Sequence, residues 1–415
     1  MLSPLYWSAL VPAALAGFFA CRRWPCVRKG WLLVCSGVFL WAVQPDWWWL
    51  TLALVALAWL APLGGKKGAA VYTALALCMM LGMKLSGQAW PVGLSFVILQ
   101  GIAYAVDAAR NVEKRGSLPD VALYMGFFPK LSAGPVCRFD SFREQANSAA
   151  ITVDSLDDGL ARLAFGMAKK LLIADGLYPV AMAAFGGETH PLAMVLSLVC
   201  CPLYVYFDFS GCTDMALGVA RLFGMALPEN FNRPFLATSI RDFWRRWHMS
   251  LSGFLRDYVY IPLGGSRRGK PRTLRNLMVV FLLMGLWHGI TWSYLLFGMF
   301  HGLLMVLEHS GVLRPDTWRK PVARLYTLLM VAVGFVIFMA PGVPRFSLSY
   351  AAWQAAVMAL SPGAVLAALA ALVLAVLEGK TLPAPLRRVL ALALLALCWA
   401  HMAAGGYMPM LYAQF

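Results

Sequence analysis

The sequence predicts a polytopic membrane protein made of α-helices, and three observations lead to this fold class. Of the 415 residues, 61% are hydrophobic and only 13% are charged, whereas soluble domains are about 45–50% apolar. The apolar runs are continuous, unlike the alternating segments of about ten residues that form a transmembrane β-barrel. The Lys and Arg residues behind the net charge of +16 cluster between these runs, which is typical of membrane topology rather than of nucleic-acid binding.

The N-terminal part of the chain predicts five spans of alternating direction. Basic clusters at 22–29, 66–67 and 110–115 follow the first, third and fifth apolar runs, while the connections at 44–46 and 84–88 lie between the others. Positive loops stay in the cytoplasm, so we expect a bacterial inner-membrane protein with a periplasmic N-terminus. No positive charge precedes the first apolar run, which favours a membrane helix over a signal peptide.

The middle of the chain is less regular. Residues 121–136 are apolar but are interrupted by proline and glycine, so this segment is a span, a re-entrant segment or a surface segment. A helix is predicted over 159–185, and Lys169 and Lys170 near its middle favour an interfacial position or an early end.

Further spans are expected after this region, separated by a stretch at 227–275 that is too polar to cross a membrane. Basic clusters at 314–324 and 380–388 place two more connections on the cytoplasmic side. The whole chain, 1–415, is therefore predicted to be one integral membrane domain of about eleven transmembrane helices with additional re-entrant or interfacial helices. The later spans are expected at 191–210, 322–341, 362–377 and 386–404.

The stretch from Ile240 to His309 holds the strongest candidate for a functional site. Its second part, 276–302, is apolar and long enough for one tilted span or for two shorter helices that break near His288 and Gly289. Ionisable residues at membrane depth usually face a bundle interior or a watery cavity. His288 is therefore the first candidate, and the alternative is a histidine that only stabilises helix packing.

Two carboxylates end the apolar run at 191–210 or follow it closely. Unpaired carboxylates are costly in apolar surroundings, so Asp208 and Asp214 are expected to be paired or to line water. Arg221 lies seven residues after Asp214, on the same face of a continuing helix, and an ion pair between them is expected. Asp208 has the alternative role of positioning a substrate or a histidine.

A dense basic zone precedes His288 and has two interpretations. The zone either lies on anionic lipid, at about 1 kcal/mol per basic residue, or binds a phosphate-bearing donor, which arginine matches in a bidentate manner. Its donor-binding candidates are Arg245, Arg246, Arg256, Arg267 and Arg268, followed by Lys270, Arg272 and Arg275.

The remaining histidines and the cysteines give weaker signals. His248 lies between Trp247 and Ser250 and is either a ligand-facing group or a buried structural donor. His301 would face away from His288 on one unbroken helix, but not necessarily across a break. The nine cysteines have no spacing typical of a metal site or of disulfides, and no metal or bound cofactor is expected.

Seven motifs, which occur in the same order as in the family, resemble the membrane-bound O-acyltransferases, and within them the bacterial polysaccharide branch that includes alginate O-acetyltransferases. They include Phe207-Asp-Phe-Ser-Gly-Cys-Thr-Asp214, a Phe-Trp-Arg-Arg-Trp-His stretch ending at His248, and Trp287-His-Gly. The motifs define a family core at about residues 90–305 and lie at 91–96, 127–135, 207–214, 228–235, 242–252, 256–265 and 286–289.

The resemblance implies roles for individual residues. The essential histidine of the family corresponds to His288, its second recurrent histidine to His248, and its motif aspartate to Asp208. The implied fold is a bundle around two opposed funnels that meet at the histidine. Supporting roles are expected for Trp287, Trp247, Ser250, His301, Asn230 and Asn232.

The implied activity is transfer of an acetyl group from a cytoplasmic thioester, acetyl-CoA or an acyl carrier, to an exported polysaccharide. Transfer is direct or passes through a periplasmic acetyltransferase, so polysaccharide assembly proteins are the expected partners. Desolvation keeps an imidazole neutral, so His288 suits a general base or a transient acyl carrier.

Three alternatives to acetyl transfer remain at this stage. The related D-alanyl-transfer branch shares several motifs and would act on a teichoic-type polymer, although the Pro262-Leu-Gly-Gly stretch is closer to the acetyl branch. A transporter or flippase would use His288 and Asp208 as a proton relay, but the two halves of the chain lack the internal similarity that inverted repeats give. A scaffold subunit would leave the buried histidine unexplained.

Overall fold

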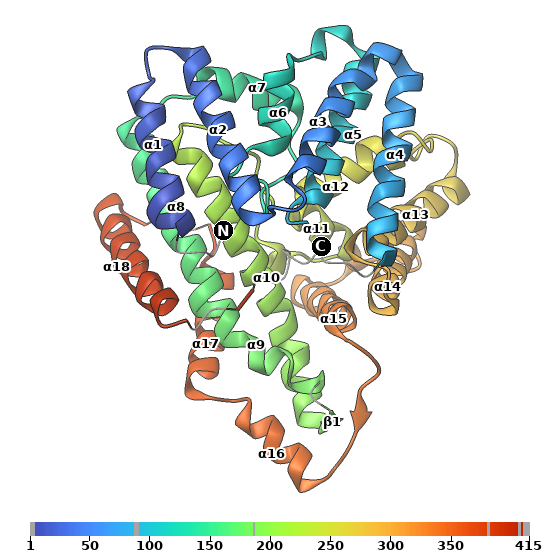
Figure 1. Cartoon of the computed structure of the whole chain (residues 1–415). Helices are drawn as coiled ribbons and strands as arrows, with labels where there is room; N and C mark the ends of the chain where they lie inside the picture. The colour runs from blue at the N-terminus through green and yellow to red at the C-terminus, as the bar shows by residue number, and fades with distance from the viewer. Residues whose placement is uncertain (1–4, 87–90, 186, 380–381, 406–407, 410–415) are drawn as a thin grey trace.

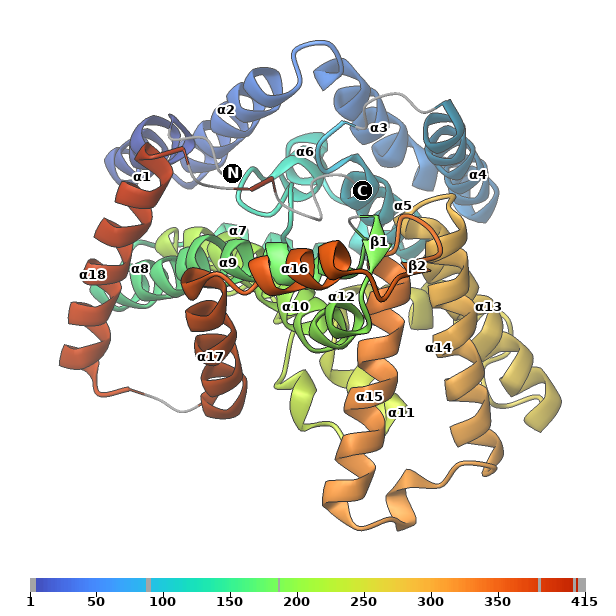
Figure 2. The same ribbon diagram turned by 90° about the horizontal axis from the view of Figure 1, so that it is seen from below.

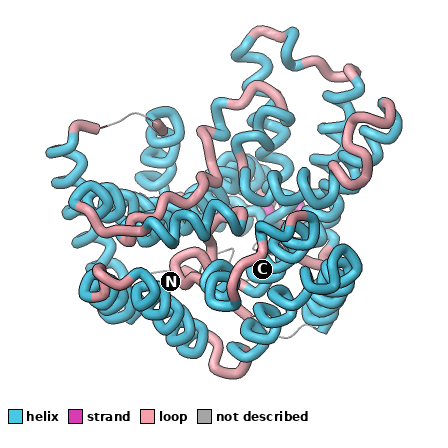
Figure 3. The backbone as a smooth tube through the Cα atoms, turned by 90° about the horizontal axis from the view of Figure 1, so that it is seen from above, coloured by secondary structure: helices cyan, strands magenta, loops and turns pink. Residues whose placement is uncertain are grey.

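The computed structural model describes residues 5–86, 91–185, 187–379, 382–405 and 408–409. Most of this part is helical (Figure 3). The predicted connection at 84–88 and the basic cluster at 380–388 lie partly outside the described residues. The α-helices are α1 (Val11–Ala20), α2 (Pro25–Val43), α3 (Trp48–Leu60), α4 (Gly65–Ser86), α5 (Leu94–Arg110), α6 (Leu118–Gly126), α7 (Phe139–Ser148), α8 (Val153–Ala168), α9 (Asp175–Ala181), α10 (Pro191–Leu222), α11 (Ile240–Arg246), α12 (Met249–Leu255), α13 (Lys270–His288), α14 (Trp292–Ser310), α15 (Lys320–Met339), α16 (Tyr350–Met358), α17 (Pro362–Leu377) and α18 (Ala384–Ala403).

Among the described residues, five helical segments are long and apolar enough to cross a membrane. A sixth is counted if α16 and α17, which are bent by 62° relative to each other, form one broken span. This result fits a helical membrane protein, and the count of about eleven transmembrane helices stays a prediction. The five segments are Pro25–Val43, Trp48–Ser86, Pro191–Leu222, Lys320–Met339 and Ala384–Ala403.

The 32-residue helix α10 runs through the centre of the molecule, with α8 and α9 on one side and α15 on the other (Figure 1). Seen from below, α1 to α4 form an outer arc, and α18 lies at the opposite edge from α13 and α14 (Figure 2). Two short parallel strands, β1 (Glu188–Thr189) and β2 (Arg345–Phe346), join the α9–α10 and α15–α16 connections. Among the candidate spans of the described residues, α10 is the most buried, with 67% of its most apolar window inside the protein, so it forms the core of the bundle.

Of the two irregular segments, 121–136 keeps one of its expected alternatives, a re-entrant segment, and the helix around Lys169 differs from expectation. Helix α6 ends at Gly126 and is followed by buried turns, so 121–136 is neither a single regular span nor an exposed surface segment. The helix predicted around Lys169 does not end there or lie at the surface. It continues from α8 through a π-helical segment, Lys169–Ala174, into α9, because the Lys170 ammonium is neutralised inside the protein.

Helices α8 and α10 approach closely through facing glycines. A Cβ atom on Gly166 would lie 2.7 Å from the backbone nitrogen of Met215, and one on Gly211 would lie 2.8 Å from the carbonyl oxygen of Gly166. Gly159 and Gly218 make the same kind of contact two helical turns away, at 2.9 Å from each other's carbonyl oxygens. Small residues at such spacing allow membrane helices to pack backbone against backbone.

We predict that Gly211→Ala destabilises the protein by about 1–3 kcal/mol, because the added methyl group meets fixed backbone of α8. Gly37→Ala on α2 is the matched control, since a Cβ there has no neighbour within 4 Å, and alanine improves helix propensity. Thermal unfolding of the detergent-purified variants measures the difference. Equal midpoints for the two variants would contradict the close approach.

Candidate active site

His288 is the last residue of α13, and the helix breaks immediately after it. Gly289 has an extended backbone, and α14 begins at Trp292 after Thr291, whose side chain accepts a hydrogen bond from the backbone of Tyr294. Of the two alternatives expected for 276–302, the structure has the two helices that break near His288. The side chain of His288 is buried, with the rings of Phe338 and Tyr294 at 5.0 and 6.0 Å between centroids.

Lys84 brings a positive charge to the same helix end. It lies in the last turn of α4, and its ammonium group donates a hydrogen bond of 3.2 Å to the backbone carbonyl of His288. The carbonyl groups at a helix C-terminus carry a partial negative charge, which a cation stabilises. Sequence reasoning missed this residue, although a lone lysine at the end of a long apolar helix is a signal that could have found it.

His248 lies between α11 and α12 in a left-handed backbone conformation, with φ of 44°. This conformation costs of order 1–3 kcal/mol for a non-glycine residue and is found preferentially at functional sites. The imidazole is buried, and its Nδ1 lies 3.3 Å from the Oδ1 of Asn230. Burial lowers the pKa of His248, which lies outside the candidate spans, to about 3, so the ring is neutral.

Asn230 organises the loop that carries His248. Its Oδ1 accepts hydrogen bonds from the Ser250 backbone and hydroxyl group, at 3.2 and 2.8 Å, and its carbonyl oxygen accepts from the Met249 backbone at 2.9 Å. Because the side-chain Oδ1 of Asn230 is an acceptor, the hydrogen bond from His248 places the imidazole proton on Nδ1. The Nε2 atom is then the basic nitrogen.

Trp287 brings the two histidines together. Its ring centroid lies 4.8 Å from that of His288 and 6.0 Å from that of His248. Phe209 of α10 packs against the other side of His248 at 4.7 Å. Two imidazoles from segments forty residues apart therefore share one aromatic, buried environment, in which hydrogen bonds and charges act more strongly than in water.

The other predicted supporting residues have different surroundings. His301 accepts a hydrogen bond of 3.4 Å from the Trp244 indole, and the Phe297 ring contacts both His301 and His288. Trp247 stacks on Phe243 at 5.4 Å, inside an aromatic cluster. The backbone of Asn232 bonds that of Arg246, so Asn232 helps to fold the loop.

Asp208 forms a buried ion pair rather than lying exposed to water. Its carboxylate lies 2.6 Å from the ammonium of Lys170, which also lies 2.6 Å from Asp175. The side chains of Lys170 and Asp208 are completely buried. The Lys170 ammonium also donates to the carbonyl of Pro409, so the C-terminal part of the chain reaches this cluster.

The expected pair between Asp214 and Arg221 is wrong. Asp214 pairs with Arg162 of α8 at 2.9 Å and with Lys169 of the π-helical segment after α8 at 2.7 Å. Arg221 pairs with Asp158 at 3.3 Å. The glycine contact brings the neighbouring helix very close to α10. Its cations therefore lie nearer to Asp214 than Arg221 does, which is two turns along α10 itself. Spacing within one helix could not indicate this.

The basic zone lies mostly at the surface. Arg246 pairs with Asp242 at 2.9 Å, as its spacing predicts, and Arg256 pairs with Asp257 at 2.8 Å. Burial raises the pKa of Asp257, but Arg256 and Arg138 outweigh it and hold the pKa below its usual value. The candidates with exposed side chains are Arg245, Arg256, Arg267 and Arg268.

Comparison with known proteins identifies the family. The family model of membrane-bound O-acyltransferases matches residues 48–349, which is more than half of the chain. The chain belongs to the membrane-bound O-acyltransferase family. The motif resemblance in the sequence is thereby confirmed.

Several curated relatives belong to the same family. The chain is 41% identical over 253 residues to the probable alginate O-acetylase AlgI of Pseudomonas putida, covering 60% of this chain and 52% of the relative. It is 34% identical over 285 residues to the peptidoglycan O-acetyltransferase of Helicobacter pylori, covering 60% and 54%. It is 30% identical over 269 residues to the teichoic acid D-alanyltransferase of Bacillus subtilis, covering 60% and 68%. The chain thus spans about half the length of the O-acetyl-transferring relatives that it matches.

We predict that Lys170→Met destabilises the protein by about 3–5 kcal/mol, because two buried carboxylates lose their shared cation. Lys169→Met is the matched control at the adjacent position. It should cost about 1 kcal/mol or less, since Asp214 is partly exposed and keeps Arg162 as a partner. Thermal unfolding in detergent compares the two, and a larger loss for Lys169→Met would contradict the buried ion pair.

Proposed function

We propose that this membrane O-acyltransferase family member transfers an acetyl group from a cytoplasmic thioester to an exported polysaccharide, directly or through a periplasmic acetyltransferase. The observation that carries the proposal is the buried pair of His288 and His248, joined through Trp287. The names of the similar alginate and peptidoglycan O-acetyl-transferring proteins support acetyl as the acyl group and a polysaccharide as the acceptor.

The chemistry requires a base for the acceptor hydroxyl group. It also requires stabilisation of the negative charge that develops on the carbonyl oxygen of the thioester. His288 takes the hydroxyl proton while the new C–O bond forms, and it returns the proton to the thiolate when the C–S bond breaks. Alternatively, its imidazole carries the acyl group transiently between thiol and hydroxyl. In both routes a neutral imidazole is the active form.

The neighbouring groups of the site supply orientation and charge. His248, whose tautomer Asn230 fixes, presents Nε2 to the aromatic site as an acceptor for a second proton or hydroxyl group. The Lys84 ammonium at the carbonyl of His288 places positive charge where an oxyanion would develop. Neither group requires a metal ion.

Transfer across the membrane requires a site that is accessible to the donor from one side and to the acceptor from the other. We expect an inner-membrane protein of about eleven membrane helices whose N-terminus is periplasmic, since the basic clusters of the N-terminal part follow every second apolar run. His288, at the break between α13 and α14, then lies where two funnels would meet.

D-alanyl transfer to a teichoic-type polymer is the second candidate. The 30% identity to the Bacillus subtilis teichoic acid D-alanyltransferase favours it, but the identity to the alginate O-acetylase of Pseudomonas putida is higher, at 41%. Offering acetyl and D-alanyl thioesters to the purified protein separates the two candidates.

We predict that His288→Ala lowers acyl transfer by at least about 100-fold, as expected when a general base is lost, while expression and membrane insertion stay near normal. His309→Ala is the control, because His309 is exposed at the end of α14. Transfer of label from an acyl thioester, measured in nanodiscs, checks both variants. Activity of His288→Ala within about threefold of the wild type would reject the assignment.

Neutralising Arg267, Arg268 and Lys270 together should raise the KM for the donor more than it lowers kcat. Charges that dock a phosphate-bearing donor act equally on the ground and transition states. The control neutralises Arg314, Arg319 and Lys320, an exposed basic cluster expected on the same side of the membrane. An unchanged donor KM together with weaker membrane association would assign the basic zone to lipid anchoring.

A further inference from the structure

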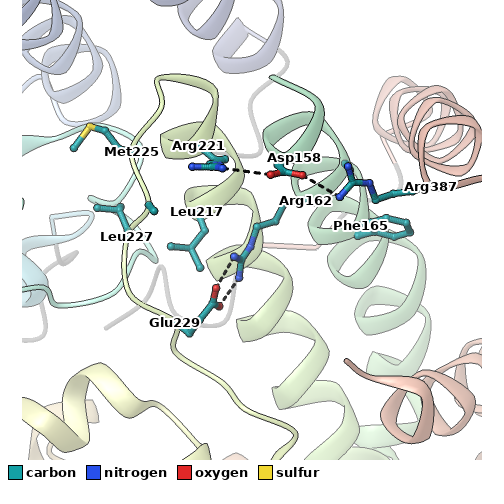
Figure 4. A pocket seen from close by; sticks show the side chains of 11 residues that line it. Asp158, Arg162, Phe165, Leu217, Arg221, Met225, Leu227, Glu229 and Arg387 are labelled. Atoms are coloured by element: carbon teal, nitrogen blue, oxygen red, sulfur yellow. Dashed lines mark hydrogen bonds and ion pairs between the residues drawn. The ribbon is translucent and has the colours of Figure 1, made fainter. Parts of the chain in front are cut away.

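A cavity of about 390 Å³ opens between α8, α10, α18 and the segment that follows α10 (Figure 4). Its volume falls in the range of small-ligand sites, about 300–1,000 Å³. Arginine side chains from three separate helices line it: Arg162 of α8, Arg221 of α10 and Arg387 of α18. Each guanidinium group faces at least one carboxylate, and planar guanidinium groups also match the oxygens of a phosphate group.

The charges of the cavity do not balance. Two carboxylates, Asp158 and Glu229, line it together with the three arginines, which leaves one positive charge. Outside the lining, Lys169 and Arg388 face Asp214 and Asp157, and Asp154 also attracts Arg388, so the excess of one positive charge belongs to the lining alone. A ligand with a single negative charge would therefore neutralise the cavity.

One of the arginines is held less tightly than the others. Arg221 has one ion pair, to Asp158 at 3.3 Å, whereas Arg162 pairs with Asp214 and Glu229 at 2.9 and 2.5 Å. About a third of the Arg221 side chain is exposed. Arg221 can therefore turn toward a ligand while Arg162 and the other ion pairs keep the cavity in shape.

The cavity lies at the end of the bundle that carries the first basic cluster. Arg28 of this cluster donates a hydrogen bond of 2.5 Å to the carbonyl of Ala149, just before α8. The turn after α10 lies at the same end, because a Cβ on Gly224 would be 2.1 Å from the Ala150 carbonyl. By the positive-inside rule this end faces the cytoplasm, where the leaflet carries anionic lipids.

The cavity also has an apolar wall that continues to the outer surface. Phe165 and Leu217 line it beside the arginines. Helix α18, one of the candidate spans, has only 17% of its most apolar window buried. The helix beside the cavity therefore presents most of its surface to lipid. A ligand that combines acyl chains with a phosphate could enter along this face.

We propose that this cavity binds the headgroup of an anionic phospholipid, with the phosphodiester held by Arg162, Arg221 and Arg387. The single negative charge of a phosphodiester equals the excess positive charge of the lining. Basic recesses between transmembrane helices on the cytoplasmic side are where such headgroups bind. The bound lipid would connect α18 to α8 and α10 and stabilise the folded bundle. The inference is independent of the acyl group that the protein transfers.

The test uses the full chain, purified and delipidated in detergent, with short-chain phosphatidylglycerol as the probe. Phosphatidylcholine and inorganic phosphate are the comparison ligands, and thermal unfolding is followed by tryptophan fluorescence. A ligand that binds only the folded state raises Tm in a saturable manner. We expect such a rise with phosphatidylglycerol and a much smaller one with the other two.

Variants locate the binding site. Arg221→Gln should weaken the response to phosphatidylglycerol at least tenfold in half-saturating concentration. Arg319→Gln should leave it unchanged, because Arg319 is exposed just before α15 and does not line the cavity. If Arg221→Gln does not fold, Arg221→Lys replaces it. This variant keeps the charge but loses the bidentate fork, so its response to phosphatidylglycerol should still be weaker than that of the wild type.

Three results would overturn the proposal. An equal response of the wild type and the Arg221 variant would place the lipid elsewhere. An equal response to phosphatidylcholine would show that acyl chains rather than the anionic headgroup stabilise the protein. An equal response to inorganic phosphate would make the ligand a free phosphate instead of a lipid.

Discussion

The close contact between α8 and α10 is the constraint on which the rest of the structure depends. Glycines at 159 and 166 face glycines at 218 and 211, so that the two backbones nearly touch. This contact places Lys169 and Lys170 of one helix against Asp214 and Asp208 of the other. An apolar bundle can hold these charges only because each cation meets a carboxylate at this distance.

The same helix α10 forms one wall of the candidate active site. Phe209, the next residue after the buried Asp208, packs against His248, and Trp287 connects His248 to His288. The ion pair at Asp208 therefore fixes the helix whose neighbouring side chain supports the histidine. We therefore propose that Asp208 positions the histidine through this helix.

Sequence patterns predicted the features that depend on residues close to one another in the chain. The apolar runs indicate a helical membrane protein, and a break near His288 and Gly289, which the structure has between α13 and α14, was one of the two alternatives for that segment. Motif order indicates the family. Each of these signals lies within one short segment of the chain.

The features that were missed depend on contacts between distant segments. Arg221 pairs with α8 rather than with Asp214, and Lys84 reaches His288 from a helix about two hundred residues earlier. The lysines near the middle of the long helix were expected at an interface or at an early helix end, but Lys170 is buried, where Asp208 of α10 and the nearby Asp175 neutralise it. Helix periodicity contains no information about which neighbouring helix supplies a counter-ion.

In the proposed function, an acyl group passes across the membrane at His288. The most direct measurement uses proteoliposomes with one protein orientation, a labelled acyl thioester on the cytoplasmic side, and a polysaccharide acceptor, together with its acetyltransferase where one is needed, on the other side. If transfer occurs at His288, we expect labelled acceptor with the wild type and none with a protein that lacks the His288 imidazole. Labelling that occurs only when donor and acceptor share one compartment would contradict it.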